Sequence, residues 1–347
     1  MMYKPGQFVG DFVIEELLDQ EPPLETYAAT RRSDQRPVVL KALPSVLASQ
    51  REHHGRFLRE AEIMQRLEHP ALPVLIFQAP ADGDQYFVME SFGGESLQLR
   101  IAERGRLEIQ EACALLDRLL EVLEFLHGEG VVVRNLGPGH LVFGDDDAGG
   151  EILRLVDFRT ARVDFETQQG QPLTQLGATL GPPEYRAPEL VMGGTFDKRC
   201  DLYSLGCVAY AMLCGHPPFL GRTAAEVIVK HLRETPAPLR PERPDIPAGL
   251  EAWILRLLRK SAKERFFDAA EAREALLHAL QHGTLPATVG ELEPPVVPAP
   301  RLAPPAQRPA PVTATAVTRP RDGGVPTWAI VATIALAGLL AVWLALR

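Results

Sequence analysis

The order of the secondary-structure signals along this chain is the feature that most limits its fold. Short segments rich in β-branched and aromatic residues come first. They predict strands over residues 12–18, 26–30, 37–42, 75–78 and 86–90, with one helix over residues 55–67. From Ser96 onward apolar residues recur at helical spacing, most clearly over residues 108–127, 201–213 and 250–259. A strand-rich part followed by a helical part predicts an α+β fold.

Composition sets broad limits on function. The chain has 347 residues, of which 46% are hydrophobic, so a sizeable core can form. A net charge of −9 disfavours nucleic acid as a partner. None of the four cysteines is in a C-x-x-C pair, so we expect buried, reduced side chains rather than zinc ligands or disulfides.

The last part of the chain has a different composition. Residues 283–326 contain eleven prolines and little apolar periodicity, which predicts a disordered or polyproline-II linker. The segment Trp328–Leu346 has 19 residues without a charge, so we expect a single transmembrane helix over residues 327–346. The alternative is a buried helix of a soluble protein, which the preceding linker disfavours.

The orientation in the membrane follows from nearby basic residues. Arg319 and Arg321 lie just before the predicted helix, and basic residues tend to stay on the cytoplasmic side of a cell membrane. We therefore expect the domain at residues 8–282 to be cytoplasmic. Because Arg347 closes the sequence, we expect no sensor domain beyond this helix.

Two motifs before the proline-rich segment carry charged side chains near apolar strands. Lys41 ends the strand VVLK, and Glu60 lies in the helix that follows. A buried lysine needs a carboxylate partner, which Glu60 can supply; the alternative is two solvated surface charges. Asp157 follows the apolar strand ILRLV in the segment VDFR, where its oxygens could bind a metal ion. The alternative is an ordinary acid at a strand end.

Further motifs complete the pattern. They are Arg134 in VVVRNLGPGH, Glu189 in RAPEL, Asp201 in DLYSLG and Arg265 in KERF. In this order and spacing, the segments resemble a eukaryotic-like serine/threonine protein kinase of the bacterial receptor type over about residues 8–280.

The resemblance implies a two-lobed protein-kinase fold, with a small β-rich lobe, a larger helical lobe, and ATP and Mg²⁺ as cofactors. It implies a Lys41–Glu60 pair, a Glu189–Arg265 pair, and Asp201 anchoring the backbone of the catalytic loop. It also implies a cofactor-contacting hinge near Glu90–Phe92 and an activation segment from Asp157 to Glu189. Phe158, the residue after the metal-binding aspartate, would pack with Val133 and Met64 in an apolar spine.

The catalytic loop departs from the family pattern at its reactive positions. Asn135 stands for the catalytic aspartate, Gly137 for the catalytic lysine and His140 for the metal-binding asparagine. An amide cannot accept a proton as a carboxylate does, and losing a general base costs ~10²–10⁴ in rate. Imidazole is a softer ligand than Mg²⁺ prefers. His140 is therefore a candidate zinc ligand, or else a surface or locally hydrogen-bonded histidine.

The phosphate-binding loop departs as well. Its glycine positions are occupied by Asp19, Glu21 and Leu24, and Pro22 and Pro23 lack the N–H donors that phosphates need. Together with Glu25, the two acids would bring negative charge toward a triphosphate. In the alternative, the acids point outward and the loop still covers a nucleotide.

Two further substitutions affect the adenine slot and the activation segment. Val39 replaces the alanine that contacts adenine, and Pro182 replaces the threonine that would bind the catalytic aspartate and lysine. Arg134 could pair with a phosphate on Thr174 or Thr179; the alternative is pairing within its own loop.

These observations predict a membrane-anchored pseudokinase that acts as a scaffold or allosteric partner of other proteins, such as an active kinase or its substrate. The alternative is an active ATP-dependent serine/threonine kinase with non-standard catalytic residues, which Lys41, Glu60 and Asp157 support. A third interpretation is nucleotide binding without transfer, as a switching ligand.

Overall fold

The computed structural model describes residues 2–20, 24–79, 84–145, 150–163, 181–193 and 195–286. The chain divides into two units, Met1–Glu293 and Pro294–Arg347. The predicted transmembrane helix and nearly all of the predicted linker lie outside the described residues. Within the described ranges, no helix combines the length and the apolar character that crossing a bilayer requires.

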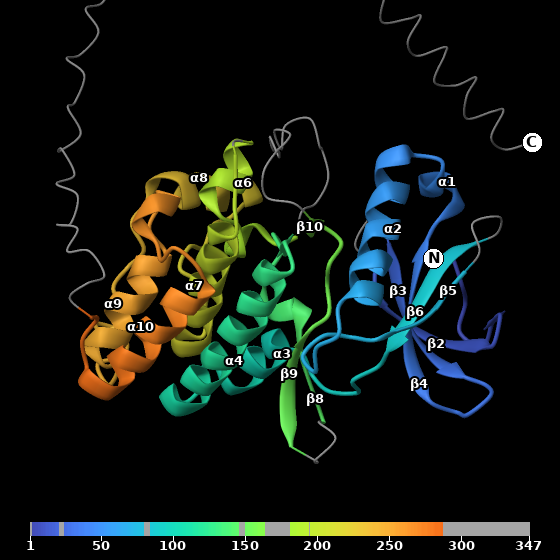
Figure 1. The fold of residues 1–347 in the computed structure, drawn as a ribbon, viewed down its shortest axis with the longest axis horizontal. Coiled ribbons are helices and arrows are strands. Elements are labelled where there is room, and N and C mark those ends of the chain that lie inside the picture. The colour runs from blue at the N-terminus through green and yellow to red at the C-terminus, as the bar shows by residue number, and fades with distance from the viewer. Residues whose placement is uncertain are drawn as a thin grey trace, which may run out of the picture. The chain divides into compact units, whose positions relative to one another are not determined.

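The first lobe is built on a six-stranded antiparallel sheet in the order β1-β2-β3-β4-β6-β5 (Figure 1). Its strands are β1 (Phe8–Val9), β2 (Phe12–Asp19), β3 (Glu25–Arg31), β4 (Pro37–Leu43), β5 (Leu75–Gln78) and β6 (Gln85–Glu90). Two helices follow β4, namely α1 (Ser45–Ala48) and α2 (Arg51–Arg66). Phe57 of α2 packs on Phe87 of β6, with ring centroids 5.1 Å apart, so α2 covers one face of this sheet.

The second lobe is mainly helical. Its α-helices are α3 (Leu97–Arg104), α4 (Ile109–Gly128), α6 (Pro188–Met192), α7 (Arg199–Cys214), α8 (Ala224–Arg233), α9 (Ala248–Leu257) and α10 (Ala269–His282). Its short helices are η1 (Pro138–His140), η2 (Pro183–Tyr185) and η3 (Ala262–Glu264), and its strands are β7 (Val131–Val132), β8 (Leu141–Asp145), β9 (Glu151–Leu155) and β10 (Arg162–Val163). β8 pairs with β9 and β7 with β10, both antiparallel. The predicted α+β order is therefore confirmed, and the helices α1, α3, α6, α8 and α10 are additional to those predicted.

The strand register gives the first sheet two different faces. Lys41 of β4 lies opposite Thr26 and Phe87, whereas its neighbour Ala42 lies opposite Glu25 and Tyr86. Directly opposed residues in a sheet share a face, and successive residues alternate between faces. The face that carries Lys41 therefore looks toward α2, and Glu25 lies on the other face.

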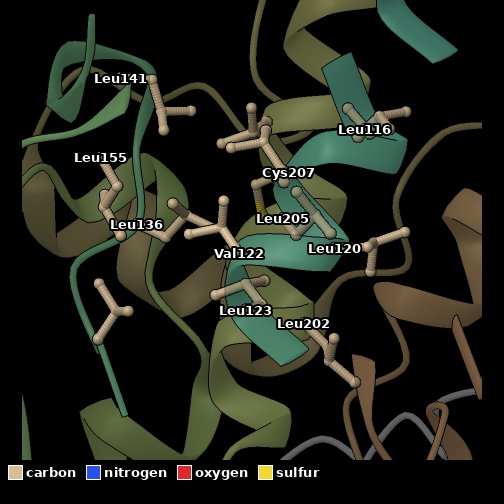
Figure 2. Close-up of a cluster of buried hydrophobic side chains, with 14 of the residues drawn as sticks. Leu116, Leu120, Val122, Leu123, Leu136, Leu141, Leu155, Leu202, Leu205 and Cys207 are labelled. Atoms are coloured by element: carbon tan, nitrogen blue, oxygen red, sulfur yellow. The ribbon is translucent and has the colours of Figure 1, made fainter. Parts of the chain in front are cut away.

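One continuous core runs from the covered face of the sheet into the helical lobe. Met64, Val133 and Phe158, the residues of the predicted apolar spine, all belong to it. Figure 2 shows its central part, where leucines of α4 and α7 pack beside Leu136, Leu141 and Leu155. This packing fixes the chain on both sides of residues 133–140. The loop with the predicted catalytic positions therefore lies between segments that are buried in the core.

Candidate active site

Lys41 and Glu60 form a buried ion pair beneath the sheet. The Lys41 Nζ donates to Glu60 Oε1 over 2.6 Å and to the carbonyl oxygen of Val156 over 3.1 Å. Glu60 is fully buried, and this burial raises the pKa of its carboxyl, although the charge of Lys41 opposes the rise. The pair joins α2 to β4, and its second hydrogen bond reaches the segment that carries Asp157.

The backbone of the 133–140 loop is anchored by Asp201 of α7. The Asp201 carboxylate accepts hydrogen bonds from the N–H groups of Val133, over 2.9 Å, and Arg134, over 2.7 Å. It also lies 3.0 Å from His127 Nε2. Arg134 has a φ of 67°, a left-handed conformation that L side chains rarely adopt, and these bonds help hold it there. The Arg134 guanidinium donates to the carbonyl of Thr160 and lies over the Phe196 ring.

Glu189 and Arg265 make the other expected pair. Their contact is bidentate, with Nη1–Oε1 and Nη2–Oε2 distances of 2.6 and 2.8 Å. Arg265 also donates to the backbone carbonyls of Arg199, Arg259 and Lys260. This side chain therefore ties the end of the predicted activation segment to the helical lobe, which is a structural role.

The Asp157 carboxylate is surrounded by donors from its own chain. Oδ1 accepts from the Arg159 N–H over 3.0 Å and from Arg159 Nε over 2.9 Å. Oδ2 accepts from Arg159 Nη2 over 3.1 Å and from Asn135 Nδ2 over 2.9 Å, and it lies 3.3 Å from His140 Nε2. A carboxylate offers about four lone-pair positions, and here at least five nitrogen atoms surround it.

Charge also favours the ionised form of Asp157. Burial would raise the pKa of its carboxyl, but Arg159, His140 and Lys41 outweigh that effect and hold the pKa well below its usual range. Asp157 is 2% exposed, so these positive groups act across a region with little water. The carboxylate is therefore charged and already neutralised by side chains.

His140 is oriented by two acceptors. Its Nδ1 lies 2.8 Å from the backbone carbonyl oxygen of Asn135, which can only accept, so Nδ1 carries a proton. Its Nε2 lies 3.3 Å from Asp157 Oδ2. Both ring nitrogens of His140 therefore face acceptor atoms of the chain itself.

Asn135 is enclosed rather than presented to a substrate. It is 8% exposed, and its amide nitrogen is bonded to Asp157. On its other side lies Gly181, where an added Cβ would come 1.7 Å from Asn135 Oδ1. Gly137 lies beside the ring of Tyr185, which a Cβ at residue 137 would approach to 3.6 Å. Neither residue offers a group that can remove a proton or carry positive charge.

The two acids predicted near the phosphate loop differ in position. Asp19 shares the face of the sheet that carries Lys41, and its Oδ2 lies 3.7 Å from Arg159 Nη1. Glu25 lies on the opposite face, where it binds the Met2 N–H and the Tyr27 hydroxyl. The expectation that Glu25 faces a triphosphate is therefore wrong, because the register of β3 turns it away. Glu21, Pro22 and Pro23 lie outside the described residues, as do Thr174 and Thr179.

The predicted hinge begins at the end of β6. Glu90 is the exposed last residue of β6, and its N–H donates to the carbonyl oxygen of Val74 over 3.0 Å. Val39 lies opposite Met89 on the face of Lys41, so its side chain borders the predicted adenine slot. The roles of Glu90 and Val39 toward a cofactor stay predictions.

A family model described as protein kinase domain matches residues 25–280. The chain belongs to this family. Serine/threonine-protein kinase pkn3 of Myxococcus xanthus is 33% identical over 270 residues, which cover 77% of this chain and 49% of the relative. PknB of Mycobacterium tuberculosis is 31% identical over 281 residues, covering 80% of this chain and 44% of the relative. The chain thus spans about half the length of the curated relatives it matches.

The fold is that of the family as well. The solved structure of the PknI kinase domain of Mycobacterium tuberculosis matches with a TM-score of 0.60 and 24% identity, covering 81% of this chain and 100% of that domain. At this identity the match shows the fold alone. Protein kinase folds have a β-rich lobe and a helical lobe, so the predicted two-lobed architecture is confirmed.

Protein kinases use ATP and Mg²⁺, so the metal ligands of the family can be compared with the residues present here. Asp157 is a suitable ligand by chemistry, but at least five nitrogen atoms surround its oxygens. His140 stands at the second ligand position, where an imidazole is a softer ligand than the asparagine oxygen that Mg²⁺ meets in the family. The residues of this kinase domain therefore do not fit Mg²⁺ as they stand.

Sequence reasoning missed the role of Arg159. The residue was visible as the replacement of the glycine that follows Asp-Phe in the family pattern. A positive charge two residues from a metal-binding aspartate is the signal that could have revealed it, because a side chain of that length can reach back to Asp157.

Proposed function

We propose that this kinase domain is catalytically impaired and signals by binding other proteins rather than by transferring phosphate. One observation carries the proposal: the Asp157 carboxylate is engaged by Arg159, Asn135 and His140. In this family the aspartate at this position holds the Mg²⁺ ions that position the phosphates and neutralise their charge. Here the same carboxylate is already paired with side chains of the chain itself.

Proton removal and phosphate stabilisation are affected as well. The residue at the position of the general base is an amide whose nitrogen is a donor to Asp157, so it cannot accept the proton of a hydroxyl group. Gly137 supplies no charge to a transferred phosphoryl group. The remaining kinase contacts, Lys41–Glu60, Asp201 with the loop and Glu189–Arg265, hold the fold together.

A second candidate is an ATP-dependent serine/threonine kinase with non-standard residues. The intact Lys41–Glu60 contact of 2.6 Å favours it, because this pair positions ATP in the family. The relatives reported above are named serine/threonine-protein kinases, which supports this second candidate more directly than the first.

Two measurements on the full chain in detergent separate the candidates. The first is transfer of radiolabelled phosphate from ATP, with Mg²⁺ or Mn²⁺, to the chain itself and to a general acceptor protein. The second is the thermal shift caused by ATP with and without the metal. We expect no transfer above that of a Lys41→Met variant. Transfer that Lys41→Met abolishes, while circular dichroism shows this variant to be folded, would establish the second candidate. A thermal shift without transfer would support nucleotide binding as a switch.

Attachment to a membrane and binding of a protein partner form part of the same proposal. The uncharged segment 327–346 supports a membrane anchor, and the loss of reactive groups supports a function through contact. The partner would be an active kinase or a kinase substrate. Fractionation of cells that produce the full chain, or a chain without residues 327–346, tests the anchor. Equal recovery of both chains in the soluble fraction would contradict it.

A further inference from the structure

We propose that Arg159 is a built-in cation that takes the place of a divalent metal ion at Asp157 and excludes metal from this kinase domain. The inference rests on the proposed function and deepens it, because it names the residue that keeps divalent metal ions out of the site. It concerns a position at which the family pattern has glycine.

The geometry of Arg159 is that of a specific pairing. Its Nε and Nη2 atoms reach different oxygens of Asp157, over 2.9 and 3.1 Å, and its backbone N–H adds a third bond over 3.0 Å. A planar guanidinium that binds both carboxylate oxygens is among the strongest side-chain contacts in proteins. The Arg159 side chain is 11% exposed and that of Asp157 is 3% exposed, so water competes little with this contact.

The pair leaves no place for a metal ion. Mg²⁺ requires near-octahedral oxygen coordination at about 2.1 Å, whereas nitrogen donors already surround both oxygens of Asp157. An entering ion would have to displace Arg159 and would then lie close to that guanidinium and to Lys41. Since the guanidinium cannot lose its proton in a protein, this repulsion persists at every ordinary pH.

A second contact extends the role of Arg159 to the sheet. Its Nη1 lies 3.7 Å from Asp19 Oδ2 at the end of β2. One guanidinium therefore links Asp157 to the strand that leads into the predicted phosphate loop. In the family a metal–nucleotide complex lies between these two regions, and here a side chain of the chain itself connects them.

The contribution of Arg159 is separable from that of His140. His140 faces only Oδ2 of Asp157, whereas Arg159 engages both oxygens. Restoring the family's asparagine at residue 140 should therefore be insufficient to admit a metal ion. Removing Arg159 as well should open the site.

The test is a titration of the full chain in detergent with Mn²⁺, followed by electron paramagnetic resonance, with and without a non-hydrolysable ATP analogue. Four chains are compared: wild type, His140→Asn, His140→Asn with Arg159→Gly, and the last with Asp157→Asn added. We expect the chain that carries His140→Asn and Arg159→Gly to bind Mn²⁺ at least tenfold more tightly than His140→Asn alone. The Asp157→Asn addition should abolish the gain.

Circular dichroism establishes that each variant is folded, and Arg159→Gln replaces Arg159→Gly if the glycine variant is not. Equal Mn²⁺ binding by His140→Asn with and without the change at Arg159 would overturn the inference, as would tight binding by the wild type. Asp34→Asn is the control, because it changes an acid in the turn between β3 and β4 that pairs with Arg31 and should leave Mn²⁺ binding unchanged. Metal binding by a wild-type chain that transfers no phosphate overturns this inference alone. Phosphate transfer by a wild-type chain that binds no Mn²⁺ overturns only the proposed function.

Discussion

Asn135 Nδ2 donates a 2.9 Å hydrogen bond to Asp157 Oδ2. The residue at the position of the catalytic base is thereby tied to the residue at the position of the metal ligand. In an active kinase both positions are carboxylates that act on different parts of the substrate complex. Here the residue at position 135 is a donor and Asp157 is its acceptor, so Asn135 adds a hydrogen bond to the carboxylate that Arg159 also binds.

This relationship predicts that Asn135→Asp does not restore activity. The new carboxylate would face Asp157 across the distance of the present hydrogen bond, and two like charges in a buried site repel each other. We expect the free energy of unfolding to fall by ~1–3 kcal/mol, because the buried bond is lost as well. Urea unfolding and radiolabel transfer measure both effects. Asn135→Ala is the control, since it loses the bond without adding charge and should be less destabilised. Transfer of phosphate by Asn135→Asp alone would contradict this account.

Removal of Lys41 should destabilise the fold as well as any nucleotide site. Lys41→Met leaves the Glu60 carboxylate buried without its cation, and breaking one side of a buried pair costs ~3–5 kcal/mol. The double variant Lys41→Met with Glu60→Gln removes both charges and should recover more than half of the loss. Chemical unfolding of the wild type, Lys41→Met, Glu60→Gln and the double variant gives the coupling free energy between the two residues. If Lys41→Met is as stable as the wild type, the pair contributes nothing to the fold.

Much of this site follows from the sequence, and what does not follow depends on contacts between distant segments. The Lys41–Glu60 and Glu189–Arg265 pairs were expected because the motifs resemble those of protein kinases, in which these positions pair. The face of the sheet on which Glu25 lies was not predicted correctly. It depends on the register between β3 and β4, and a shift of one residue would move Glu25 to the other face. Arg159 was visible as a substitution, but its partner could be named only once its side chain was placed.

His231 should make stability depend on pH in the acidic range. Burial lowers the pKa of its imidazole to about 4, and the charge of Lys260 adds to the effect. Its Nδ1 lies 2.9 Å from the Tyr203 hydroxyl. Because the pKa is lower in the folded state than the usual 6.5, the unfolded chain binds more protons below pH 6.5. The stability contributed by neutral His231 is therefore present above pH 6.5 and is lost as the pH falls through about 4.

The full loss corresponds to ~3 kcal/mol at 1.36 kcal/mol for each pKa unit. Urea midpoints measured between pH 7 and pH 4 should fall less steeply for His231→Gln than for the wild type. His278→Gln provides the matched control, since the His278 ring lies near the surface in the C-terminal part of α10, where it contacts the Thr284 carbonyl oxygen and the His282 ring. Parallel pH profiles for His231→Gln and the wild type would show that His231 does not contribute this dependence.

We expect alanine to lower the free energy of unfolding more at Gly181 than at Gly93. Both glycines have a positive φ, 70° at Gly181 and 66° at Gly93, so alanine at either residue costs ~1–2 kcal/mol of backbone strain. A Cβ at Gly93 would meet nothing within 4 Å, whereas one at Gly181 would lie 1.7 Å from Asn135 Oδ1. Gly181→Ala must therefore displace Asn135 from Asp157 and should lose a further ~1–3 kcal/mol. Urea unfolding of the two variants measures the difference. If Gly181→Ala and Gly93→Ala are equally destabilised, Asn135 is not held between Gly181 and Asp157.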